Sequence, residues 1–310
     1  MPTTFKPAGQ ASDLFKSLSG RENSDIYIIF AADKPPLRQA ASRHGSNKFV
    51  SAPGLHCLCP ENNDTMESLK ELYKIGNGPS SSHTMGPKKA AERFAERCHD
   101  ADAYRVTLYG SLAATGKGHL TDAAILSVLE PLAPTEIVWK PEVVLPFHPN
   151  GMLFEGLKAG NVADSWTIYS IGGGALANET SRLETPHSIY PLTTVSEIKA
   201  WCSHEGKTYW EYVTDCEGPE IWDYLDEIWT MMCETIQRGL NNDGVLPGGL
   251  KVARKASTYW VKSKSYTDSL KSRAQIYAYA LATSEENASG GTVVTAPTCG
   301  SCGVVPAVLY

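Results

Sequence analysis

The sequence predicts an α+β protein in which an N-terminal α/β domain precedes a mostly helical region. Between residues 66 and about 200, short alternating or β-branched stretches that end at glycines are interspersed with helical patterns. Beyond residue 200, apolar side chains recur at the spacing of one helix face. We therefore expect one domain over 66–204 and the N-terminal part of a helical domain over 205–310.

The amino-acid composition argues against several classes of protein. The chain has 310 residues, of which 42% are hydrophobic, so it can bury an ordinary core. A net charge of -6 argues against a nucleic-acid partner, which would favour a basic surface. No apolar run approaches the roughly 20 residues that a membrane span requires. Eight cysteines without a signal peptide predict reduced thiols and a cytoplasmic location.

Residues 1–65 differ from the rest of the chain in amino-acid composition and periodicity. They mix proline, glycine, serine and charged residues without sustained periodicity. Such a composition is typical of a poorly structured extension. The segment that begins at Met66, MESLKELYKIG, has a helical pattern, so we expect the folded unit to begin there.

The segment KIGNGPSSSHTMGP (74–87) predicts a loop followed by a helix that starts at Pro87. A helix N-terminus offers unpaired N–H groups that suit a carboxylate or a phosphate. One serine would be enough to cap the helix, whereas this loop carries five polar side chains in a row. We therefore interpret it as a ligand site formed by Ser80, Ser81, Ser82, His83 and Thr84.

A predicted strand over 104–108 leads into a second glycine-rich turn, GSLAATGKGHLTD (110–122). A lone histidine is more often structural than catalytic, but His119 lies between Lys117 and Asp122 in a flexible backbone. The G-x-x-x-x-G-K-[ST] spacing of a phosphate-binding loop is absent. Thr121 is expected to cap the next helix, which starts at Ala123.

Further strands are predicted over 136–139, 152–155 and 166–171. The last strand ends at the triple glycine 172–174, which indicates either a tight turn or the close approach of a ligand. In the helical region, one apolar face includes Ile221, Leu225, Ile228 and Met232, and the helix is expected to stop at the polar run 241–244.

The final stretch, GGTVVTAPTCGSCGVVPAVLY (290–310), places Cys299 and Cys302 three positions apart in a glycine-flanked turn. Cysteines at this spacing serve metals, iron–sulfur clusters or redox disulfides. A thiol–disulfide oxidoreductase is disfavoured because the aromatic residue and βαβ context that accompany such a motif are missing. The residues alone leave the metal and cluster alternatives open.

Taken together, three long stretches resemble the iron–sulfur-dependent L-serine dehydratases of the single-chain bacterial type. They are IGNGPSSSHTMGP (75–87), YGSLAATGKGHLTD (109–122) and ENASGGTVVTAPTCGSCGVVPAVL (286–309). Supporting matches are LPFHPNGM (145–152), YSIGGG (169–174) and GVLPGGLKVARKA (244–256). The matches run in the family's order from about residue 67. Asn77 departs from the apolar residue that is common before GPSSSHT.

The resemblance implies a serine dehydratase β-type domain, followed by an α-type catalytic domain that is incomplete in this sequence. It also implies a 4Fe-4S cluster held by three cysteines, with one iron open to substrate. Cys302 matches a ligand position, and Cys299 is kept as a second candidate. The remaining ligands of the family lie downstream of the matched stretch. We therefore expect a fragment, or a chain completed by another polypeptide, that leaves Val304, Val305, Val308 and Leu309 without packing partners and exposed.

The resemblance implies L-serine as substrate, conversion to pyruvate and ammonia, and a homodimer once the helical domain is complete. Loop 80–84 would hold the substrate carboxylate, with Lys117 and Asn150 as further substrate-binding candidates. His83, His119 and Asp122 are the candidate acids and bases. Two alternatives stay open: a fragment that only binds an amino acid, and a related iron–sulfur lyase that acts on cysteine.

Overall fold

The computed structural model describes residues 66–179 and 188–310, so the prediction for residues 1–65 lies outside the described residues. The chain divides into two units: one comprises 69–187 with 222–310, and the other comprises 188–221 with the residues up to Ser68. Strands and helices are mixed as the sequence predicts, which confirms the α+β class. The proposed domain boundary at 204/205 stays a prediction.

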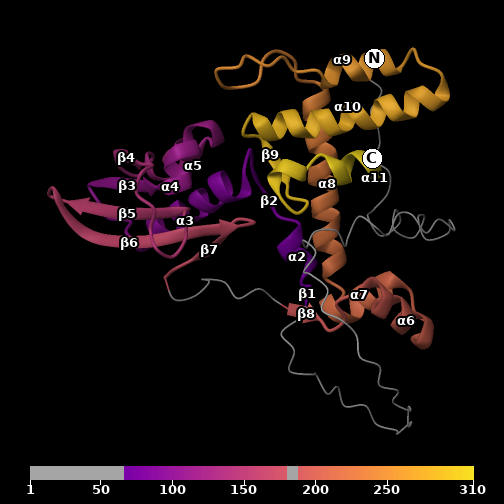
Figure 1. The fold of residues 1–310 in the computed structure, drawn as a ribbon, viewed down its shortest axis with the longest axis horizontal. Coiled ribbons are helices and arrows are strands. Elements are labelled where there is room, and N and C mark those ends of the chain that lie inside the picture. Colours follow the sequence, from indigo (N-terminus) through magenta and orange to yellow (C-terminus); the bar gives the residue numbers. More distant parts are fainter. Residues whose placement is uncertain (1–65, 180–187) are drawn as a thin grey trace, which may run out of the picture. The chain divides into compact units, whose positions relative to one another are not determined.

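The larger unit contains a five-stranded sheet with the order β4-β3-β5-β6-β7 (Figure 1). Its strands are β3 (Ala103–Tyr109), β4 (Thr135–Lys140), β5 (Gly151–Lys158), β6 (Asn161–Gly172) and β7 (Ala175–Ala177). β3 and β4 are parallel, and the other neighbours are antiparallel. A crossover that includes α4 (Gly110–Thr115) and α5 (Thr121–Leu129) joins β3 to β4. All predicted strands of this region are present and extend slightly further.

Two helices, α3 (Gly86–Arg97) and α5, cover one face of this sheet (Figure 1). Side chains alternate between the two faces of a strand, so Tyr104, Val106 and Leu108 of β3 all point into the core. They pack there with Phe94 of α3 and Ile125 of α5, and all five are at most 1% exposed. Full burial of such a side chain contributes about 1.5–3 kcal/mol. This core fixes where α3 begins and therefore where the loop before it lies.

The triple glycine forms the tight turn between β6 and β7. Gly172, Gly173 and Gly174 all have positive φ, at 106°, 58° and 74°. Such backbone angles are costly for residues with a Cβ, which explains the three glycines. Of the two alternatives considered from the sequence, the structure shows the turn.

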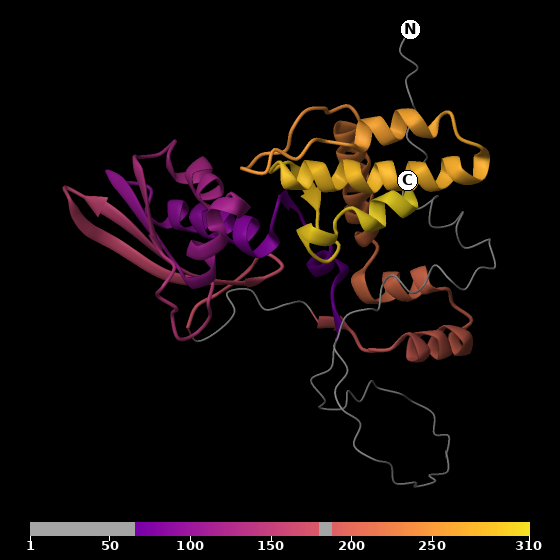
Figure 2. The ribbon, with the colours of Figure 1, turned by 45° about the horizontal axis from the view of Figure 1, so that its top comes forward.

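The helical part of this unit is built from α8 (Ile221–Leu240), α9 (Ala256–Ser263) and α10 (Asp268–Ala288). α9 and α10 lie side by side, as Figure 2 shows. The predicted apolar face of α8 is buried, since Ile221, Leu225, Ile228 and Met232 are at most 8% exposed. The helix ends immediately before the polar run 241–244, as predicted.

A short antiparallel pair joins the two parts of the larger unit. β2 (Ile75–Asn77) pairs with β9 (Thr292–Val294), so residues more than 200 positions apart are neighbours. This pairing corrects the expected helix over 66–76, of which only α2 (Leu69–Leu72) forms. Backbone groups of 75–77 pair with β9 and are unavailable to a helix. Beyond β9 follow the 3₁₀ turn η4 (Cys299–Ser301) and α11 (Val304–Leu309).

The smaller unit pairs β1 (Met66–Glu67) with β8 (Ser188–Tyr190) and contains α6 (Val195–Glu205) and α7 (Tyr209–Glu217). Both helices begin with a capping box, in which a threonine and a glutamate three residues later satisfy each other's backbone N–H groups. Among the helices of the described residues, none has both the length and the apolar character needed to cross a membrane.

The turn that carries the cysteines packs tightly on α10 through Gly303. A Cβ at Gly303 would lie 2.7 Å from the carbonyl oxygen of Ala280 and 2.9 Å from Oγ of Ser284. We expect Gly303→Ala to destabilise the chain by about 1–3 kcal/mol, measured by thermal or urea unfolding. Gly300→Ala is the matched control, because its nearest new contact would be 3.8 Å away. Equal stability of the two variants would contradict this packing.

Candidate functional site

The polar loop before α3 forms a single π-helical turn, η2 (Ser81–Met85), that continues directly into α3. Single π-helical turns are found frequently at functional sites. Ser80 is the N-cap, and its Oγ accepts a hydrogen bond from the backbone N–H of His83 at 3.1 Å. Within the described residues, the backbone N–H groups of Ser81 and Ser82 form no hydrogen bond. The loop therefore presents free donors beside several hydroxyls.

The 3₁₀ segment η3 (Gly116–His119) and the first residue of α5 are joined to η2 by two threonine hydrogen bonds. Oγ1 of Thr84 donates to the carbonyl of His119 at 2.7 Å, and Oγ1 of Thr121 donates to the carbonyl of His83 at 2.5 Å. The expectation that Thr121 caps α5 is therefore wrong. The N-cap of α5 is Leu120, which makes no side-chain capping bond, because the Thr121 hydroxyl is used across the site.

The two histidine rings lie together in this site. Their centroids are 4.7 Å apart and the rings are tilted by 36°. Nδ1 of His83 lies 2.9 Å from Oγ of Ser82, and its Nε2 lies 3.1 Å from Oγ of Ser111. Partial burial and the neighbouring His119 lower the pKa of His83 below its ordinary value. His83 is therefore neutral at pH 7.

The backbone fixes the tautomer of His119. Nδ1 of His119 lies 3.0 Å from the carbonyl oxygen of Thr115. A carbonyl can only accept, so Nδ1 carries the hydrogen. In the neutral ring, the lone pair is then on Nε2, the nitrogen suited to accept a proton.

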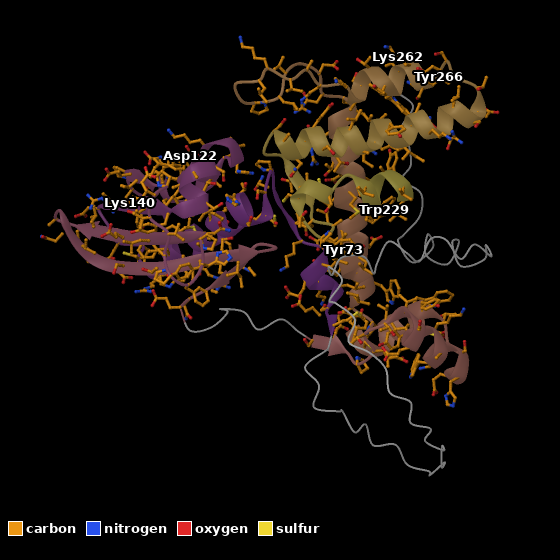
Figure 3. All side chains as sticks on the ribbon, in the orientation of Figure 1. Tyr73, Asp122, Lys140, Trp229, Lys262 and Tyr266 are labelled. Atoms are coloured by element: carbon orange, nitrogen blue, oxygen red, sulfur yellow. The ribbon has the colours of Figure 1, made fainter. Side chains whose placement is uncertain are left out.

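The other predicted site residues lie at different distances from this centre. Asn150 is buried and donates to the carbonyl of Ser170, whose hydroxyl donates to the carbonyl of Ser82, so Asn150 supports the loop from behind. Lys117 is exposed, and its ammonium lies 5.5 Å from the centre of the Trp139 ring. Asp122 stands at the start of α5, where Oδ1 accepts from the N–H of Ala123 (Figure 3). Thr115, rather than Asp122, orients His119.

The structure adds residues that were not predicted from sequence. Ser111 lies in the glycine-rich turn 110–122, three residues after the predicted strand 104–108. A hydroxyl so close to the end of a strand could have been recognised as a candidate site residue. Asn287, near the end of α10, donates through Nδ2 to the carbonyl of Pro79 at 3.2 Å. Gly78 donates through its backbone N–H to the carbonyl of Gly291 at 3.0 Å. The end of α10 thus borders the polar loop, and nothing local in the sequence indicates this.

Positive charge gathers beside η2. A hollow of about 320 Å³ adjoins Met85 and the backbone of β2. Its charged lining residues are Lys74, Lys88, Lys89 and Glu92. Lys74 is ion-paired with Glu71 at 2.7 Å, so three ammonium groups face two carboxylates here, a small positive excess that favours an anionic ligand.

Cys299 and Cys302 are both buried, at 0% and 1% exposure, and pack with Val293. Sγ of Cys299 lies 3.5 Å from Sδ of Met85, which connects the cysteine turn to η2. Burial raises the pKa of the Cys299 thiol to about 11 and that of Cys302 to about 12, so both thiols are protonated at neutral pH.

A cluster with three cysteine ligands needs a third thiolate. Within residues 66–179 and 188–310, no group of three or more histidine, cysteine or acidic side chains is placed to hold a metal ion. These two thiols therefore do not form a complete cluster site by themselves.

Known proteins share sequence similarity with this chain. The family model described as "Serine dehydratase beta chain" matches residues 68–137, which include η2, α3 and η3. L-serine dehydratase 1 of Escherichia coli is 36% identical over 301 residues. The chain belongs to the L-serine dehydratase family. Other similar family members are the L-serine dehydratases of Streptomyces coelicolor and Mycobacterium bovis, at 35% and 36% identity.

The family relationship covers most of this chain and part of each relative. The matches span 79%, 78% and 78% of this chain for the three relatives. They span 65%, 65% and 64% of those proteins' own length, just under two thirds. The residues matched by the family model contain the loop and the histidine pair.

The hydrogen bond from Thr121 to the carbonyl of His83 can be tested directly by substitution. Thr121→Val keeps the volume of this fully buried side chain but leaves the carbonyl of His83 without its donor. We expect it to lower the free energy of unfolding by about 1–3 kcal/mol, the cost of an unsatisfied buried polar group. Urea unfolding of the purified chain measures this.

Thr121→Ser is the control for that substitution, because it retains the hydroxyl and removes only a methyl group. We expect it to cost less than Thr121→Val. If the valine variant were the more stable of the two, the hydrogen bond to His83 would not hold the two turns together.

Proposed function

We propose that this chain carries the substrate-binding and proton-abstracting part of an L-serine ammonia-lyase, which converts L-serine to pyruvate and ammonia. The observation that carries the proposal is the pair of imidazoles held 4.7 Å apart against the hydroxyl-rich start of a helix. Family membership supports it, since similar proteins are named as L-serine dehydratases.

The substrate carboxylate binds at η2. The free N–H groups of Ser81 and Ser82 and the hydroxyls of Ser80 and Ser82 supply donors, and the nearby lysines favour an anion. Thr84 is occupied differently, since its hydroxyl accepts from the N–H of Ser80 and donates to His119. Thr84 therefore positions the site, and the serines contact the carboxylate.

His119 takes the proton from Cα of the substrate. Its Nδ1 is committed to Thr115, so Nε2 is the basic nitrogen, and a positioned base of this kind contributes about 10²–10⁴-fold. His83 stays neutral between the hydroxyls of Ser82 and Ser111. Its neutral ring places no second positive charge beside His119.

Loss of the β-hydroxyl needs help, because hydroxide is a poor leaving group. A 4Fe-4S cluster with one open iron would supply a Lewis acid when bound. Cys302 is the proposed ligand, with Cys299 as the second candidate. Because these two thiols do not complete a three-cysteine set, we assign the chain's own residues only to binding and proton transfer. Elimination of water gives aminoacrylate, which tautomerises and hydrolyses to pyruvate and ammonia.

Several further expectations belong to this proposal. The domain limits 66–204 and 205–310, a homodimer and a cytoplasmic location remain proposals. The free thiols of the described residues support a reducing compartment. Lys117 and Asp122 remain candidates for substrate binding and acid–base chemistry at the rim of the site.

The test uses a protein that contains this chain and is reconstituted anaerobically with iron and sulfide. Its activity is measured as the pyruvate formed from L-serine. We expect His119→Gln to lower kcat at least 100-fold with little change in KM, as loss of a general base requires. Ser82→Ala should mainly raise KM. The visible absorbance of the reconstituted protein should be unchanged in both variants.

His204→Gln is the matched control, because this histidine lies in the smaller unit with a side chain that is 84% exposed. Full kcat in His119→Gln, or loss of absorbance on its substitution, would refute the role of His119. Sulfide release from L-cysteine in place of pyruvate from L-serine would show the alternative lyase.

A further inference from the structure

Asn287 has a buried oxygen without a hydrogen-bond donor. The residue is 8% exposed, and its Nδ2 donates to the carbonyl of Pro79 at 3.2 Å. That bond fixes the amide, because the flipped orientation would place two acceptors face to face. Oδ1 is then left without a hydrogen-bond partner within the described residues. Buried side-chain oxygens usually have a partner, so this one requires an explanation.

The orphaned oxygen lies at the edge of the proposed substrate site. Oδ1 of Asn287 is 2.2 Å from the position that a Cβ on Gly78 would occupy, so it lies directly over that glycine. Gly78 and Pro79 lead into Ser80, the N-cap of η2. On the same segment as Asn287, Gly290 approaches Leu120, which follows His119 in the chain. The end of α10 and the residues just after it therefore contact residues that flank both turns of the site.

A bound amino acid needs hydrogen-bond donors for its carboxylate and an acceptor for its ammonium group. Loop 80–84 offers N–H and O–H donors, which suit the carboxylate. The ammonium group requires an acceptor, because a buried charge without one is costly. Asp122 is partly exposed and accepts from its own helix. We propose that Oδ1 of Asn287 accepts a hydrogen bond from the substrate ammonium group, an inference that rests on the proposed function.

This role makes Asn287 a determinant of specificity. A ligand with the same carboxylate and hydroxyl but no amine, such as 3-hydroxypropanoate, would gain nothing from Oδ1. An α-amino acid would lose a charge-assisted hydrogen bond if the oxygen were removed. Hydrogen bonds to charged groups have a strength that corresponds to about 10- to 100-fold in affinity.

The experiment is a calorimetric titration of the purified chain with L-serine and with 3-hydroxypropanoate, for the unsubstituted protein and Asn287→Ala. We expect the substitution to weaken L-serine binding about 10- to 100-fold and to leave 3-hydroxypropanoate binding unchanged. Asn242→Ala is the control, because Asn242 also bonds to α10, through Glu286, but is exposed. It should change neither affinity.

Asn287→Asp keeps the inference testable if Asn287→Ala fails to fold. The aspartate has nearly the same shape, keeps the acceptor and adds a negative charge, but it replaces the donor to the Pro79 carbonyl with an oxygen. The ratio of the two affinities is therefore the quantity compared. The ratio of the variant's affinity for L-serine to its affinity for 3-hydroxypropanoate should be at least as high as in the unsubstituted chain. Equal losses for both ligands in either variant would overturn the role of Asn287 alone. Failure of the unsubstituted chain to bind either ligand would overturn the proposed function as well.

Discussion

Two buried threonine hydroxyls hold the candidate site together. Thr84 of η2 donates to the carbonyl of His119, and Thr121, the first residue of α5, donates to the carbonyl of His83, so the backbone at each histidine is bound by a threonine. Both threonines are at most 3% exposed, where water does not compete for these bonds. The short distance between the rings follows from this arrangement, as does the lowered pKa of His83.

A second constraint brings the end of α10 to the same place. The β2–β9 pair aligns Asn77 with Thr292, and Asn77 also donates to the carbonyl of Gly290 and accepts from Lys88. Asn77 thus forms polar links between both sides of the site. This pairing carries Asn287 to the polar loop and Cys299 to Met85. The binding groups and the cysteine turn are therefore positioned by one short ladder.

Local patterns predicted the strands of the sheet and the start of the helix after the serine loop. The alternation of Tyr104, Val106 and Leu108 predicted β3, and Pro87 marked the start of the helix after the serine loop. Local sequence patterns gave wrong predictions where contacts with residues distant in the sequence determine the structure. Thr121 has the position of a capping residue, yet its hydroxyl binds His83. Residues 75–77 continue a helical pattern, yet they pair with β9 more than 200 residues away.

Nitrogen-15 NMR of the histidine rings across a pH titration tests the central claim most directly, with His83→Gln and His119→Gln to assign the signals. The structure requires His119 to carry its hydrogen on Nδ1 when neutral, and His83 to titrate below the ordinary pKa of 6.5. Addition of L-serine should shift both sets of signals. A neutral His119 protonated on Nε2, or a His83 that titrates above 6.5, would contradict the proposed division of roles between the two histidines.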